Sequence, residues 1–158
     1  SSVYQYEGPA AVRYPRGQGP GEKINRDLES VKIGKANLLK KGSSKLIMLN
    51  FGSLLNHAKE IAKKYDMTLI DMRFIKPFDE GILKKYSNAK WFITIEDGSL
   101  IGGIGSTIAN WVTEQNFKIQ VKCFGIPDKF IEHMSREQMI KEAKLDYESI
   151  TKELDKIF

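Results

Sequence analysis

The sequence predicts an α/β fold built around a largely parallel sheet. From residue 31 onward, short apolar runs alternate with segments whose apolar residues recur at helical spacing. This alternation is typical of parallel sheets, because each parallel connection has to cross back over the sheet. The 158 residues are enough for a domain with its own core.

Five segments have the pattern of strands. Residues 31–39 alternate weakly, which predicts an edge strand, and residues 46–50 form the continuous apolar run typical of a buried strand. Further strands are expected at residues 68–72, 91–95 and 120–124.

Helices are predicted between the second, third and fourth of these strands. Ser53 stands where it can cap a helix whose apolar positions recur over residues 54–65. Asp79 is expected to cap a short helix that ends near Tyr86, with Phe78 placed before the cap as a hydrophobic staple.

The last third of the chain predicts three more helices. Residues 104–112 have apolar positions at helical spacing and should cross back over the sheet. Ser135 and Gln138 form a capping box, and Asp146 is expected to cap a terminal helix.

The beginning of the chain resembles the end of another folded unit. Residues 10–14 are strand-like and stop at Pro15-Arg16-Gly17, and there is no initiator methionine. Residues 17–23 are rich in glycine and polar residues, which favours a connector. We therefore expect a domain boundary near Gly17.

The charge pattern favours a solvated, lysine-rich surface. The net charge is +5, but the lysines are spread along the chain among acidic residues instead of forming a block. Nucleic-acid binding is therefore not expected. A stretch of roughly 18 apolar residues and a signal pattern are both missing from the sequence, so we expect no membrane span and a cytoplasmic location.

The segment Gly102–Ile108 is the most suggestive motif. It follows a strand and opens a helix, where free N–H groups can hold a phosphate. However, Ile108 stands where the dinucleotide fingerprint has its third glycine. We therefore favour close packing of small residues, or a subunit contact, over nucleotide binding.

Glu96 and Asp97 follow a central strand, at the edge where open α/β sheets place their ligand-binding groups. Paired carboxylates at such an edge can bind a cation or act as acid and base, but the sequence has no second acidic cluster with ligand spacing. A structural or interface role is the preferred interpretation.

The remaining reactive side chains predict no reaction centre in residues 31–158. Cys123 is the only cysteine and alternates with Val121, which indicates an inert strand position. His57 and His133 lack neighbouring cysteine or histidine partners, so no metal site is expected.

Six motifs follow one another along the chain. They are Gly8 to Gly17, Ile33-Gly34-Lys35-Ala36, Asn50-Phe51-Gly52-Ser53-Leu54, Asp71 to Asp79, Glu96-Asp97-Gly98 with Gly102-Gly103-x-Gly105-Ser106, and Gly125-Ile126-Pro127-Asp128-x-Phe130-Ile131. Together they closely resemble the last third of the 1-deoxy-D-xylulose-5-phosphate synthases, a family of the transketolase superfamily.

The resemblance implies a three-layer αβα sandwich with a mostly parallel sheet of about five strands. It implies that residues 1–17 end a pyrimidine-binding domain, residues 18–30 form a linker, and residues 31–158 form a transketolase-type C-terminal domain. The parent would be a homodimer that uses thiamine diphosphate and Mg²⁺, bound in domains outside this chain, to condense pyruvate with D-glyceraldehyde 3-phosphate.

Among these residues, the resemblance implies a substrate role only for Arg16, which matches the family arginine that grips the phosphate of the acceptor aldehyde. From local sequence alone an exposed loop arginine is the simpler interpretation. For residues 31–158 the resemblance implies a scaffold and dimer role without catalytic residues, with contact patches at Met72-Arg73-Phe74 and Gly102 to Ser106.

Two alternatives remain open. The chain could end another transketolase-superfamily enzyme, such as a transketolase or the beta subunit of a 2-oxo-acid dehydrogenase. It could also be a stand-alone interaction or small-ligand module of flavodoxin-like shape.

Overall fold

The computed structural model describes residues 6–12 and 30–158, and the chain divides into a unit of residues 1–33 and a unit of residues 34–158. Residues 6–12 form neither strand nor helix, and Val12 is exposed. Residues 10–12 therefore do not form the strand expected at 10–14, and residues 13 and 14 lie outside the described part. A strand needs a partner for its backbone groups, and none is described for these residues.

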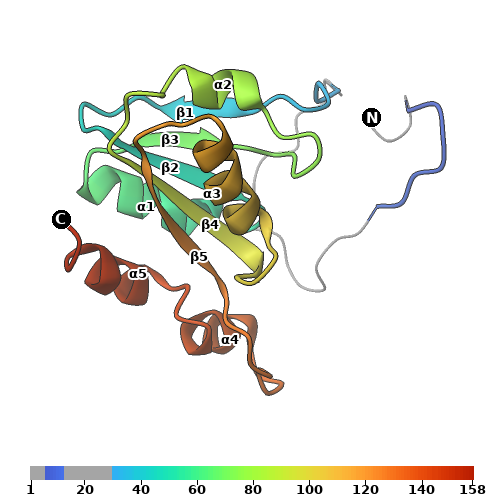
Figure 1. The fold of residues 1–158 in the computed structure, drawn as a ribbon. Helices are drawn as coiled ribbons and strands as arrows, with labels where there is room; N and C mark the ends of the chain where they lie inside the picture. Colours follow the sequence, from blue (N-terminus) through green and yellow to red (C-terminus); the bar gives the residue numbers. More distant parts are fainter. Residues whose placement is uncertain (1–5, 13–29) are drawn as a thin grey trace. The chain divides into compact units, whose positions relative to one another are not determined.

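The second unit contains a five-stranded sheet in the order β1–β3–β2–β4–β5 (Figure 1). Strands β2 to β5 run parallel to their neighbours, while β1 is antiparallel to β3. The predicted mostly parallel α/β fold is confirmed. The strands are β1 (Asn37–Lys40), β2 (Leu46–Phe51), β3 (Thr68–Asp71), β4 (Trp91–Ser99) and β5 (Gln120–Ile126).

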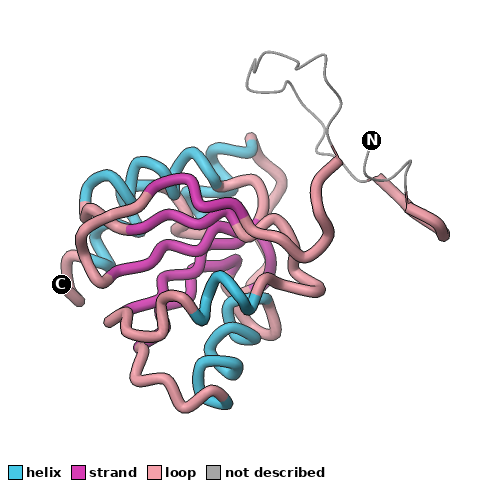
Figure 2. The backbone as a smooth tube through the Cα atoms, turned by 90° about the horizontal axis from the view of Figure 1, so that it is seen from above, coloured by secondary structure: helices cyan, strands magenta, loops and turns pink. Residues whose placement is uncertain are grey.

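Helices cover both faces of this sheet (Figure 2), so the predicted three-layer arrangement is also confirmed. Helices α1 and α5 pack on one face, and α2 and α3 pack on the other. The helices are α1 (Leu55–Lys64), α2 (Glu80–Lys84), α3 (Ile104–Glu114), α4 (Arg136–Glu142) and α5 (Tyr147–Leu154).

Each face of the sheet has its own apolar core. Met48 on β2 packs with Ile61 of α1 and Ile150 of α5, whereas its neighbour Leu49 packs with Ile108 on the α3 side. Successive residues of a strand point to opposite faces. Strand β2 is therefore apolar without interruption because both of its faces are buried.

The edge strand differs from its prediction. It begins at Asn37 instead of Val31, and its register with β3 is interrupted between Leu38 and Lys40. Gly34 has φ +69°, so the chain turns before the strand can start. A weak alternation of apolar residues could not reveal this turn.

Asp79 holds the segment that leads into β1. Its buried carboxylate accepts the backbone N–H groups of Ala36 and Ile82, both at 3.2 Å, and lies 3.4 Å from the ammonium of Lys35. Burial alone would raise the pKa of Asp79, but these hydrogen bonds and the charge of Lys35 lower it below its usual value. Asp79 therefore caps α2, as predicted, and also holds the segment that precedes β1.

The other predicted caps have mixed outcomes. The capping box of Ser135 and Gln138 and the cap at Asp146 are both present. Ser53, however, does not cap α1: the helix begins at Leu55, its N-cap residue is Leu54, and no side chain accepts a hydrogen bond there. The Ser53 prediction was wrong because its hydroxyl is bonded to groups far away in sequence.

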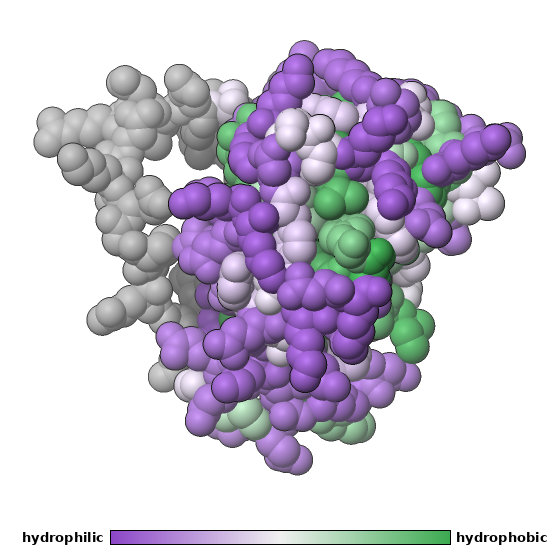
Figure 3. Space-filling view, turned by 90° about the vertical axis from the view of Figure 1, so that its left-hand side faces the viewer, coloured by the Kyte–Doolittle hydropathy of each residue, from purple (hydrophilic) through white to green (hydrophobic). Residues whose placement is uncertain are grey.

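The surface supports the prediction of dispersed, compensated lysines. The side of the molecule that lies at the left in Figure 1 is mainly hydrophilic, with a small hydrophobic area enclosed between polar residues (Figure 3). Several lysines are ion-paired, including Lys40 with Asp66 at 3.0 Å and Lys64 with Asp155 at 2.9 Å. None of the helices in the described ranges is long and apolar enough to cross a membrane.

Candidate functional site

The amino end of α3 is capped by the side-chain carboxylate of Glu96. Glu96 is only 5% exposed; its Oε1 accepts the backbone N–H of Gly105 at 2.8 Å, and its Oε2 accepts that of Ile104 at 3.2 Å. Free N–H groups at a helix start attract anions. Glu96 supplies that anion, so the place where Gly102–Ile108 suggested a phosphate is already filled.

Two glycines make this contact possible. A Cβ on Gly103 would lie 2.0 Å from the carbonyl oxygen of Ser99 and 2.6 Å from the carboxylate of Glu96. A Cβ on Gly105 would lie 2.7 Å from Oγ1 of Thr94 and 3.0 Å from Sγ of Cys123. The glycines thus allow close packing of α3 on β4 and β5, which is the interpretation that we favoured from the sequence.

Glu96 and Asp97 belong to β4 itself, which continues to Ser99 instead of stopping at residue 95. The two carboxylates have different surroundings: Glu96 is buried under α3, and Asp97 is exposed. Asp97 accepts a hydrogen bond from the hydroxyl of Ser53 on the loop after β2. The structural role that we favoured for this pair is what Glu96 has.

Arg136 completes a cluster that the sequence did not predict. The guanidinium of Arg136, at the start of α4, donates to the same Ser53 hydroxyl that contacts Asp97. Residues 53, 97 and 136 are far apart along the chain and share no motif. Only the position of Ser53 and Asp97 at the carboxyl ends of neighbouring strands could have indicated their contact.

A second polar contact lies between the ends of β2 and β3. The buried amide of Asn50 donates to Oδ1 of Asp71 at 3.2 Å and to the carbonyl of Gly52 at 3.1 Å. Nε of Arg73 lies 3.8 Å from Oδ2 of Asp71. These contacts hold the ends of two parallel strands together.

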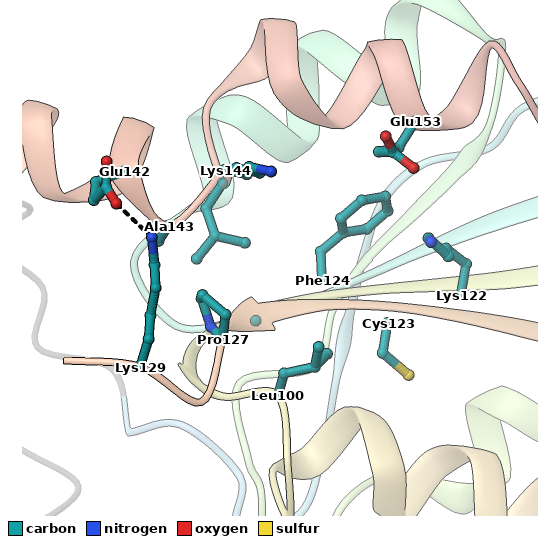
Figure 4. Close-up of a pocket in the computed structure, with 12 residues that line it drawn as sticks. Leu100, Lys122, Cys123, Phe124, Pro127, Lys129, Glu142, Ala143, Lys144 and Glu153 are labelled. Atoms are coloured by element: carbon teal, nitrogen blue, oxygen red, sulfur yellow. Dashed lines mark hydrogen bonds and ion pairs between the residues drawn. The ribbon is translucent and has the colours of Figure 1, made fainter. Parts of the chain in front are cut away.

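A pocket of about 360 Å³ lies between β5 and the segment that joins α4 to α5, and Figure 4 shows the residues that line it. Its charged groups are largely compensated: Lys129 pairs with Glu142, and Glu153 pairs with Lys156. The ammonium of Lys122 lies 5.5 Å from the centre of the Phe124 ring. No nucleophile with an adjacent base is found among the residues that line this pocket.

Cys123 is half-buried on β5 and points to the opposite side of the strand from Phe124 (Figure 4). Burial raises the pKa of its thiol, which keeps it protonated and unreactive. This agrees with the inert role predicted for it. Within residues 6–12 and 30–158, no three His, Cys, Asp or Glu side chains come together as a metal site.

The predicted contact patches are only partly available at the surface. Met72 is fully buried, so it cannot contact a partner, whereas Arg73 is exposed. The most exposed apolar side chains near these patches are Ile75 and Ile101, at 61% and 68%. Arg16, the predicted substrate-binding residue, lies outside the described residues.

Comparisons with known proteins identify the fold and its relatives. Residues 34–150 match the family described as "Transketolase, C-terminal domain". The chain is 45% identical over 157 residues to 1-deoxy-D-xylulose-5-phosphate synthase of Francisella tularensis subsp. novicida strain U112, and 44% identical to that of subsp. mediasiatica strain FSC147. Each alignment covers 98% of this chain and 25% of the relative, so the chain spans a quarter of the relative's length.

A solved structure supports the same assignment. The chain superimposes on a split gene transketolase, described as an inactive beta4 tetramer, with a TM-score of 0.71 and 25% sequence identity. The match covers 85% of this chain and 44% of the transketolase chain. The chain therefore belongs to the transketolase C-terminal domain family, and its relatives place it with the carboxy-terminal region of the 1-deoxy-D-xylulose-5-phosphate synthases.

Proposed function

We propose that this chain is the carboxy-terminal part of a 1-deoxy-D-xylulose-5-phosphate synthase. The observation that carries the proposal is the 45% identity over 98% of the chain to a protein of that name. The full enzyme condenses pyruvate with D-glyceraldehyde 3-phosphate and releases carbon dioxide, for isoprenoid, thiamine and pyridoxal synthesis. It would be a cytoplasmic homodimer that depends on thiamine diphosphate and Mg²⁺.

Within that enzyme, residues 34–158 act as a supporting domain. The unit has an apolar core on each face of its sheet, which supports independent folding. The described residues do not fit the diphosphate of the cofactor at the start of α3, because Glu96 occupies that position. We therefore assign no catalytic step to this domain and expect the isolated chain to be inactive.

Arg16 is the residue that we propose to touch substrate. Pro15 restricts the backbone beside it and Gly17 frees the backbone after it, which suits a guanidinium that forms two parallel bonds to a phosphate. A grip on the phosphate of the acceptor orients its distant carbonyl. Residues 1–17 would then end the preceding domain and residues 18–30 would link it to residues 31–158. The division of the chain after Ile33 supports a boundary in this region.

Assembly is the role proposed for the exposed loops after β3 and β4. Ile75 and Ile101 each expose most of their apolar surface, and exposed Arg73 is close to Ile75 in sequence. Largely exposed apolar side chains are found at contacts between domains or subunits. We propose that these loops contact the preceding domains or the second subunit.

The product of the full-length protein that contains this chain tests the proposal. The purified protein, with thiamine diphosphate and Mg²⁺, should convert pyruvate and D-glyceraldehyde 3-phosphate to 1-deoxy-D-xylulose 5-phosphate and carbon dioxide. Formation of a ketol-transfer product from a ketose phosphate, without use of pyruvate, would instead identify a transketolase.

A further inference from the structure

The strand order creates a crevice that the proposed function does not use. Strands β2 and β4 are parallel neighbours, but β2 connects through α1 to β3 on one side, and β4 connects through α3 to β5 on the other. In open α/β sheets, ligands bind outside the carboxyl ends of two strands whose connections diverge in this way. Here those ends carry Ser53 and Asp97.

A pocket of about 330 Å³ opens at this place. Its volume lies within the range of small-ligand sites, at the lower end. Most of the lining is apolar and comes from the loops after β2 and β5 and from α4. The apolar residues that form its walls include Leu54, Ile126, Ile131, Met139, Ile140 and Leu145.

Opposite charges stand together at the rim of this pocket. Asp97 and Arg136 both line it, and both contact the hydroxyl of Ser53, so they lie no more than roughly two hydrogen-bond lengths apart. Neither forms an ion pair with the other or with any other charged group in the described ranges; Lys129, the third charged residue of the lining, is paired with Glu142. A carboxylate and a guanidinium thus remain able to accept two opposite charges of a ligand.

Phe130 adds an independent sign that the pocket is incomplete. It lines the pocket, yet the residue is 102% exposed, so its ring packs on nothing described. A large aromatic side chain that is fully exposed beside an apolar pocket marks a surface that a ligand, another domain or a second subunit can cover.

From these observations we propose that the pocket binds a free α-amino acid with an apolar side chain. The side chain enters the apolar pocket beside Phe130, the ammonium group binds Asp97, and the carboxylate binds Arg136. A ligand with a carboxylate but no ammonium group would leave Asp97 without a partner beside the ligand's negative charge. A ligand with an ammonium group but no carboxylate would leave Arg136 without a partner beside the ligand's positive charge. Each should therefore bind less tightly than the zwitterion.

Titration of the 158-residue chain with L-leucine and L-phenylalanine tests this proposal. We expect saturable binding by calorimetry with a Kd of about 0.1 to 1 mM, as small ligands of this size allow. In ¹⁵N NMR spectra, the shifted amides should cluster around Phe130 and Arg136. Leucinamide, which lacks the carboxylate, and 4-methylpentanoate, which lacks the ammonium group, should each bind at least about tenfold more weakly.

Variants locate the site. Arg136→Ala and Asp97→Asn should each weaken leucine binding about tenfold, and Phe130→Ala should weaken it without lowering stability, because its ring has no packing to lose. Lys141→Ala and Glu137→Gln change charges on α4 outside the pocket lining and should leave the Kd unchanged.

Two results would overturn the proposal. One is the absence of saturable binding of both amino acids up to about 10 mM. The other is a Kd for leucine that stays unchanged in both Phe130→Ala and Arg136→Ala, or a Kd for 4-methylpentanoate equal to that for leucine. In either case the residues at the rim would have no part in recognition.

Discussion

The carboxylate of Glu96, near the end of β4, accepts the backbone N–H of Gly105 at 2.8 Å. A buried acid from a strand thereby satisfies the first turn of α3, the helix that follows it in the chain. Because of this contact, the glycine-rich segment positions the start of α3 and does not hold a phosphate.

Replacing Glu96 should therefore destabilise the domain. Glu96→Ala leaves two buried N–H groups without an acceptor and should lower the free energy of unfolding by about 2 kcal/mol, and Glu96→Gln by about 1 kcal/mol. Urea unfolding measures both. Glu114→Gln, at the exposed last residue of the same helix, is the control and should have little effect. An unchanged unfolding free energy in Glu96→Ala would refute the capping role.

Adjacent glycines should differ in their tolerance of alanine. Gly102 has φ +71° but open space around it, so Gly102→Ala should cost only backbone strain of about 1 kcal/mol. Gly103→Ala would place its Cβ 2.0 Å from the oxygen of Ser99 and should cost about 3 kcal/mol or prevent folding. Thermal unfolding of the two variants compares these costs. Equal melting temperatures would show that the start of α3 is not in close contact with the end of β4.

Asp66 should contribute to stability in a pH-dependent way. Hydrogen bonds from the hydroxyl and backbone N–H of Ser43, with the charge of Lys40, lower the pKa of Asp66 from 3.8 to about 2. Because the folded-state value is the lower one, its contribution is present above pH 3.8 and is lost as the pH falls toward 2.

The comparison of Asp66→Asn with the parent chain isolates this effect. Melting temperatures should differ most above pH 4 and converge near pH 2. Asp128→Asn is the control, because the Asp128 side chain makes no hydrogen bond or ion pair to a described residue. A difference that stays constant across this pH range would mean that the charge of Asp66 is not involved.

Phe158 should fasten the end of the chain to the sheet. Its ring makes edge contacts with Tyr65 and Trp91, at centroid distances of 5.8 and 6.0 Å. Phe158→Ala should lower the free energy of unfolding by about 1 kcal/mol and change the fluorescence of Trp91. Phe130→Ala removes a ring without such contacts and should do neither. Identical effects of the two substitutions would contradict the packing described for Phe158.

Arg16 should act on the acceptor substrate in the full-length enzyme. Arg16→Ala should raise KM for D-glyceraldehyde 3-phosphate by at least about tenfold and leave KM for pyruvate nearly unchanged, because the lost bonds are to the phosphate. Arg16→Lys keeps the charge but not the two-pronged geometry and should fall between. Arg26→Ala, in the proposed linker, is the matched control. Unchanged kinetics for both substrates in Arg16→Ala would remove the assignment.

Local sequence predicted the features that depend on local chemistry. The apolar runs of β2 and β4 reveal strands buried on both faces, and the caps at Asp79, Ser135 and Asp146 follow from side chains that bond three residues ahead. Those patterns depend on residues that are close in the sequence, so they can be recognised without knowledge of the tertiary structure.

Contacts between distant segments could not be predicted in this way. Ser53 is a suitable cap by its position, but its hydroxyl donates to Asp97 and accepts from Arg136, which lie 44 and 83 residues away. The short antiparallel β1 likewise depends on the turn at Gly34 and on Asp79, which binds the backbone of Ala36 across 43 residues. The pocket beside Arg136 was missed for the same reason, since its lining residues come from four separate segments.

We propose that residues 34–158 form a supporting domain without a cofactor site, because Glu96 fills the anion position at the start of α3. Calorimetric titration of the 158-residue chain with thiamine diphosphate in the presence of Mg²⁺ tests it most directly. We expect no saturable heat of binding, while the full-length protein should bind the cofactor under the same conditions. Saturable, stoichiometric binding to the 158-residue chain would contradict it.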